Sequence, residues 1–131
     1  MNEHEIQFVD TFVSSNKRER FRELLVNPRK REKLTSTLDH STDLRVEFQT
    51  AILPSKQTPA KIYSTLSNLG APETCYLISA NPKLDGQVIG LAEALADVVG
   101  YGDGTFISCI PGRLGYFESA EPNGRFIFEK K

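Results

Sequence analysis

The chain has 131 residues, and its 16 basic and 17 acidic side chains leave a net charge of −1. Its 39% hydrophobic and 25% charged residues are typical of a globular domain and exclude the disordered, collagen-like and disulfide-scaffold classes. No apolar run approaches the roughly 20 residues that cross a bilayer, and the first residues do not resemble a signal peptide. We therefore expect one cytoplasmic domain over residues 1–131, with a helical part over about 3–70 and a sheet part over about 73–130.

The N-terminal part is predicted to be helical. Apolar residues at three- and four-residue spacing predict a first helix around Ile6–Val13 and a second around Phe21–Leu25. The pair Asn27-Pro28 is typical of a helix start and predicts a third helix, which ends near Asp39-His40.

The segment Leu44–Leu53 fits two structures. Apolar and polar residues alternate at its start, as in a strand, yet Leu44, Phe48 and Ile52 also fit one helical face. The alternation and the flanking turn residues favour an edge strand. A helix follows over about 59–69, because Thr58-Pro59 is typical of its start and Gly70 of its end.

The second half is predicted to form a sheet. Turn residues separate β-prone segments, and one amphipathic helix ends at Gly100. The predicted strands cover 74–79, 105–110, 114–118 and 125–129, and the helix covers 91–99. The fold class is therefore α+β, with N-terminal helices followed by a β-α-β-β-β mixed sheet whose last three strands form an antiparallel meander. If strands 74–79 and 105–110 are neighbours joined through the helix, they should run parallel.

Both faces of the predicted sheet are apolar, which is unusual for an antiparallel sheet with one wet face. One face carries Phe117, Phe126 and Phe128, and the other carries Leu114, Tyr116 and Ile127. Either helices cover both faces, or one face meets a partner.

Several kinds of catalytic and cofactor site are disfavoured. The two histidines, His4 and His40, lie far apart, and no Cys-x-x-Cys pair is present, so we expect no metal or cofactor. Cys75 and Cys109 fall in apolar strands, where a thiol usually packs as a small inert side chain. The glycine cluster 100–104 follows a helix instead of preceding one, so a turn is favoured over a phosphate site. The chain is therefore expected to be non-enzymatic.

One candidate site depends on the parallel pairing. The carboxyl ends of strands 74–79 and 105–110 would then gather Ser79, Asn81, Asp85 and Arg113 at one edge. Arg113 could hold a small anion or pair with Asp85 in a structural ion pair, and the ion pair is favoured. An antiparallel pairing would take the set apart.

A second candidate is the basic stretch 17–33, whose local charge is +5. Arg18, Arg22, Arg29 and Lys30 could contact phosphates of a nucleic acid. The interspersed glutamates and the lack of interleaved aromatic residues favour a solvated helical face instead.

The leading functional hypothesis is a small non-enzymatic protein-interaction domain, either an oligomer or an inhibitor- or immunity-like partner of another protein. The alternative is a ligand-binding or enzymatic site for a small anion at the strand ends. Nucleic-acid binding comes third, and no membrane contact is expected.

Overall fold

The computed structural model describes residues 1–38, 43–121 and 124–131. The described strands form a six-stranded sheet in the order β1-β6-β5-β4-β2-β3. The strands are β1 (Gln49–Ala51), β2 (Thr74–Ser79), β3 (Val88–Gly90), β4 (Thr105–Ile110), β5 (Leu114–Glu118) and β6 (Arg125–Glu129). The α-helices are α1 (Glu3–Gln7), α2 (Arg18–Val26), α3 (Arg31–Thr37), α4 (Pro59–Asn68) and α5 (Leu91–Val98). A π-helix follows α1 (Phe8–Phe12), and short 3-10 turns lie at Ser15–Lys17, Val46–Phe48 and Pro54–Lys56.

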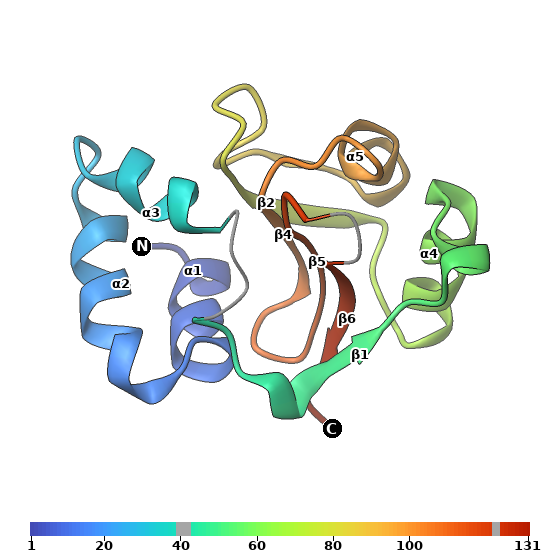
Figure 1. Cartoon of the computed structure of the whole chain (residues 1–131), viewed down its shortest axis with the longest axis horizontal. Helices are drawn as coiled ribbons and strands as arrows, with labels where there is room; N and C mark the ends of the chain where they lie inside the picture. The colour runs from blue at the N-terminus through green and yellow to red at the C-terminus, as the bar shows by residue number, and fades with distance from the viewer. Residues whose placement is uncertain (39–42, 122–123) are drawn as a thin grey trace.

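Helices cover both faces of this sheet, which makes the fold α+β as predicted. Figure 1 shows the N-terminal helices on one side of the strands and α4 and α5 on the other. The two-sided cover explains why both faces are apolar. The chain's own helices therefore explain the two apolar faces, which the sequence alone could also attribute to a partner. In the described ranges, no helix has the length and apolar character needed to cross a membrane.

The face under the N-terminal helices is rich in aromatic residues. The Phe8 ring lies 4.6 Å from the Phe106 ring, and the Phe12 ring lies 5.4 Å from the Phe128 ring, measured between centroids. Phe117 packs in the same buried cluster. These edge-to-face and tilted pairs each add stability beyond their buried area.

The opposite face is mainly aliphatic. Ile62 and Leu66 of α4 and Leu95 of α5 pack on Leu77 and Ile107 of the sheet. Leu114, Tyr116 and Ile127 belong to this cluster, and Phe117 and Phe128 to the other, so the predicted assignment of side chains to the two faces is confirmed.

The predicted parallel pairing of strands 74–79 and 105–110 is wrong. β2 and β4 are neighbours but antiparallel, with Ser79 opposite Thr105, and the described strand pairs are all antiparallel, so the sheet is not mixed. The reason is the short strand β3, which runs back along β2 and brings Gly90 opposite Thr74. Helix α5 therefore starts near the beginning of β2 and runs in the same direction as β2. The chain then enters β4 beside the end of β2, so β4 must run in the opposite direction.

The ambiguous segment 44–53 is a strand only at its end. Gln49–Ala51 forms the edge strand β1, which pairs with β6 so that Ala51 lies opposite Phe126. Val46–Phe48 is a 3-10 turn. Helix α4 has its predicted limits, because the Thr58 hydroxyl accepts a hydrogen bond from the Lys61 amide and Gly70 adopts a φ of 103°.

The third predicted helix starts later than expected. The Asn27 side chain accepts from the Arg29 amide in a turn, and α3 begins only at Arg31. Its predicted end near Asp39-His40 lies outside the described residues.

Candidate functional site

Three of the four residues predicted at the strand ends do lie together. The Asp85 carboxylate accepts a hydrogen bond from the Ser79 amide (3.0 Å), and the Ser79 hydroxyl accepts one from the Asn81 amide (3.0 Å). The Ser79 hydroxyl also lies 2.7 Å from the Thr105 hydroxyl. These bonds satisfy backbone groups of the loop after β2, so they hold the loop in shape.

Arg113 lies at the other end of the sheet. β4 begins beside Ser79 and carries the chain away over five residue steps, roughly 16 Å of strand, before the turn that holds Arg113. There Arg113 lines a hollow with Leu69 and Lys130. The expected group of four residues is therefore not assembled, because it required parallel strands.

Arg31 takes the place expected for Arg113. Its guanidinium donates to both carboxylate oxygens of Asp85, at 2.6 and 3.1 Å, and to a carboxylate oxygen of Glu5 at 2.5 Å. The Tyr76 hydroxyl donates to the same Glu5 oxygen at 2.6 Å. Burial alone would lower the pKa of Arg31, but its bonds to Asp85 and Glu5 raise it above the ordinary value. We call Glu5, Arg31, Tyr76 and Asp85 the Arg31 cluster.

The Arg31 cluster joins the N-terminal helices to the sheet. Arg31 comes from α3, Glu5 from α1, Tyr76 from β2 and Asp85 from the following loop. Burial and the bond to Glu5 raise the pKa of Tyr76 to about 12, so the phenol stays protonated and keeps donating. Since 26 and 54 residues separate Arg31 from its two carboxylates, sequence spacing carries no signal of these contacts.

A cleft of about 290 Å³ lies beside the Arg31 cluster, lined in part by Glu32, Thr35 and Ser79. The Arg31 charge is already matched by two carboxylates, and Glu32 adds a third negative charge to the neighbourhood. An anion entering this cleft would therefore meet net negative charge, which opposes its binding.

The predicted basic surface is partly used within the chain. Arg22 pairs with Asp10, and Arg18 donates to the Val13 carbonyl at 3.2 Å. Arg29 and Lys30 are exposed in the turn before α3. The four cations therefore differ in their surroundings, and two of them have partners in the fold.

Cys75 and Cys109 are free, buried thiols. Burial raises the pKa of both, that of Cys75 to about 12, so the reactive thiolate is disfavoured. In the described part of the chain, no three His, Cys, Asp or Glu side chains are grouped so that they could hold a metal ion.

The glycine cluster is held by a buried carboxylate. Glu118 accepts hydrogen bonds from the Gly100 and Gly102 amides, at 3.1 and 2.8 Å, and from the Tyr116 hydroxyl at 2.7 Å. Both glycines have positive φ angles, 90° and 73°, which ordinary residues rarely adopt. These amides are bound to a carboxylate of the chain itself, whereas a phosphate site would require them to be free.

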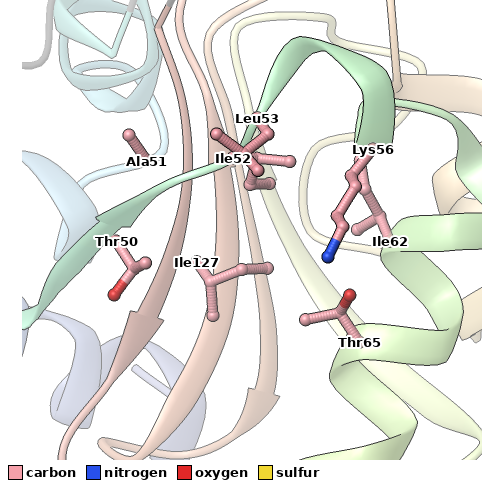
Figure 2. A pocket seen from close by; sticks show the side chains of 8 residues that line it. All are labelled: Thr50, Ala51, Ile52, Leu53, Lys56, Ile62, Thr65 and Ile127. Atoms are coloured by element: carbon pink, nitrogen blue, oxygen red, sulfur yellow. The ribbon is translucent and has the colours of Figure 1, made fainter.

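An apolar hollow lies between the edge strand β1 and helix α4. It has a volume of about 280 Å³, and we call it the β1–α4 hollow. Figure 2 shows its walls: the chain from β1 to the following turn, Ile62 and Thr65 of α4, and one side chain of β6. Its lining residues are Thr50, Ala51, Ile52, Leu53, Lys56, Ile62, Thr65 and Ile127.

Local structure explains why this hollow stays open. Thr50 stands opposite Ile127, so both side chains point to the face that α4 covers. The chain leaves β1 after Ala51, and a turn at Pro54–Lys56 leads it into α4. Leu53 is left 61% exposed at the rim.

The charged residue in the lining of this hollow is Lys56. Lys56 reaches from its turn toward Thr65 in Figure 2. A second hollow of about 290 Å³ shares Lys56 and Thr65 and adds Ser55, Lys61 and Ser64. The Lys61 ammonium donates to the Ser55 carbonyl at 2.8 Å, and among the described residues neither lysine forms an ion pair. Sequence reasoning did not single out any of these residues.

Comparisons with protein families, with curated proteins and with solved structures found no match to this chain.

Proposed function

We propose that this chain is a non-enzymatic protein-interaction domain that contacts its partner at the β1–α4 hollow. The observation that carries the proposal is the hollow itself: an apolar recess of about 280 Å³ beside an exposed leucine, Leu53, at the edge of the sheet. Protein interfaces commonly place an anchor side chain into such a recess and surround it with polar contacts.

The side-chain chemistry elsewhere supports a binding role over a catalytic one. The buried thiols are disfavoured as thiolates, and Glu118 and the Arg31 cluster bond to the chain itself. A cytoplasmic location is part of the proposal, since Cys75 and Cys109 are free thiols on neighbouring strands.

The test is site-specific photo-crosslinking in the cells that make the protein naturally. A photoreactive phenylalanine analogue replaces Leu53 in one variant and Val88 in the control, since Val88 is 68% exposed on the opposite edge strand β3. We expect a discrete protein adduct from position 53 alone. The second substitution Thr65→Trp, which fills the hollow, should remove that adduct.

The proposal fails if position 53 gives no adduct. It also fails if both positions give the same adducts, or if the adduct survives the filling of the hollow. Each of these results would mean that the hollow does not receive a partner.

A further inference from the structure

We infer that the partner segment at the β1–α4 hollow is acidic, with one apolar side chain that enters the hollow and carboxylates that meet Lys56 and Lys61. This inference rests on the proposed function and adds the chemistry of the partner.

The charge around the hollow is uniformly positive. The two adjoining hollows are lined by apolar, hydroxyl and lysine side chains, and the described lining contains no carboxylate. Lys56 lines both hollows, so a segment anchored in either hollow lies next to the Lys56 ammonium group. A negative segment is attracted to such a rim, and a positive one is repelled.

The position of Lys61 is unfavourable for the helix on which it lies. Lys61 is the third residue of α4, and no acidic residue lies in that first turn. The positive end of a helix dipole disfavours a cation there, whereas a glutamate would complete a capping box with Thr58. For the helix dipole and the cap, lysine is therefore less favourable here than glutamate, at the helix end that borders the second hollow, and such a conflict is typical of a residue that serves binding.

The volume is compatible with a single anchoring side chain. At about 280 Å³, the hollow lies at the small end of the range of about 300 to 1,000 Å³ that is usual for small-molecule sites. Anchor residues at protein interfaces are single apolar or aromatic side chains that fill recesses of this kind.

Positive charge continues along the same side of the sheet. Glu129 lies two residues beyond Ile127 on the same face of β6, and it lines a hollow with Arg113, Lys130 and Lys131. Three cations and one carboxylate leave that hollow with a net positive charge. A segment that follows α4 from Lys61 toward this end would meet cations at both ends of its path.

The test uses capped pentapeptides added to the isotopically labelled full chain, with binding followed by NMR chemical shifts. The probe carries one leucine between two pairs of glutamates; a second peptide has lysines in place of the glutamates, and a third has glycine in place of the leucine. We expect the first peptide to shift the amides of residues 50–56 and 61–65. Both other peptides should bind at least about fivefold more weakly, the size expected for two exposed ion pairs or a lost anchor.

Charge reversal at Lys61 supplies the matched pair of variants. Lys61→Glu should weaken binding of the acidic peptide about fivefold without unfolding α4, because glutamate suits that helix position. Lys83→Glu makes the same change of charge at an exposed site in the loop after β2, and it should leave the affinity unchanged.

The outcomes separate this inference from the proposed function. Equal binding of the glutamate and lysine peptides would overturn the acidic partner while the hollow remains a binding site. A crosslink at position 53 without binding of the acidic peptide would also overturn only this inference. Binding of octanoate at residues 50–65 without a response to any peptide would identify a small carboxylate ligand and overturn it as well.

Discussion

The two faces of the sheet are closed in different ways. The face under the N-terminal helices packs Phe8, Phe12, Phe106 and Phe128 against one another and is tied to the helices by the Arg31 cluster. The opposite face is aliphatic, and α4 leaves the β1–α4 hollow open beside β6. One face therefore contributes mainly to stability, whereas the other keeps unfilled apolar space at its edge. Substitutions on the two faces should therefore have effects of different size and sign.

The largest effect is expected from Arg31→Met. Loss of the guanidinium leaves the Glu5 carboxylate, 6% exposed, and the Asp85 carboxylate without a positive partner, so the free energy of unfolding should fall by about 3–5 kcal/mol. Urea denaturation followed by circular dichroism measures it. The exposed pair of Arg22 and Asp10 is the control, and Arg22→Met should cost less than about 1 kcal/mol. Equal losses would mean that the Arg31 cluster does not stabilise the aromatic face.

Glu118→Gln tests the end of the aliphatic face at which Glu118 binds the glycine cluster. An amide cannot replace the carboxylate that accepts from Gly100, Gly102 and Tyr116, so we expect a loss of about 2 kcal/mol in the free energy of unfolding. Hydrogen exchange at the two glycine amides should accelerate at the same time. Unchanged exchange would show that the loop does not depend on Glu118.

Thr65→Leu and Thr11→Leu make the same change on the two faces. Leucine at 65 fills part of the hollow and favours the helix, so the free energy of unfolding should rise by about 1 kcal/mol. Thr11 is buried, and its hydroxyl lies against the turn at Gly112, so leucine there should cost about 1–3 kcal/mol through overpacking. Thermal denaturation shows whether each variant is more or less stable than the original protein. A change of the same sign in both variants would mean that the two faces do not differ in unfilled space.

Lys61→Glu should raise the free energy of unfolding by about 0.5 kcal/mol, because an acidic residue in the first turn of α4 suits the helix dipole and caps it with Thr58. Chemical denaturation in low salt measures this gain, which high salt should reduce. A destabilised variant would mean that the bond from Lys61 to the Ser55 carbonyl outweighs the dipole.

The smallest effect concerns His4 on the aromatic face, which stacks on Tyr76 and lies 2.7 Å from the Ser108 hydroxyl. Burial lowers the pKa of His4 below its ordinary value of 6.5 and outweighs the opposing influence of Glu3. The unfolded chain therefore takes up this proton more readily, and the free energy of unfolding should decrease as the pH falls below 6.5. Urea denaturation at about pH 7.5 and about pH 5.5 measures the decrease, which His4→Gln should reduce. An identical pH dependence in the variant would exclude His4 as its source.

Local patterns predicted the elements of this fold well. The apolar, β-prone run Thr105–Ile110 and the turn residues after it predicted the limits of β4, and the cap at Thr58 with the stop at Gly70 predicted those of α4. These features depend on neighbouring residues, which is why spacing in the sequence is informative there. The three-residue strand β3 was missed because so short a run has no measurable period, and the direction of β4 was wrong as a consequence.

The candidate sites depended on contacts between distant parts of the chain. Ser79, Asn81 and Asp85 were grouped correctly because they are close in sequence. The arginine that pairs with Asp85 was not predicted correctly, because nothing in the sequence near Asp85 distinguishes Arg31 from Arg113. The β1–α4 hollow arises where β1 pairs with β6 under α4, so no single segment could have indicated it.

The place of β6 also determines the order in which the chain can fold. β6 lies between β1 and β5, so β1 has no neighbour in the sheet until residues 125–129 are available. The ring of Phe12, made early on the ribosome, packs on Phe106 and Phe128, which are made late. The N-terminal helices must therefore keep their aromatic side chains unburied through most of synthesis, and contacts of such long sequence separation slow folding. Loss of the last strand would leave β1 without its neighbour in the sheet and would remove one of the rings on which Phe12 packs.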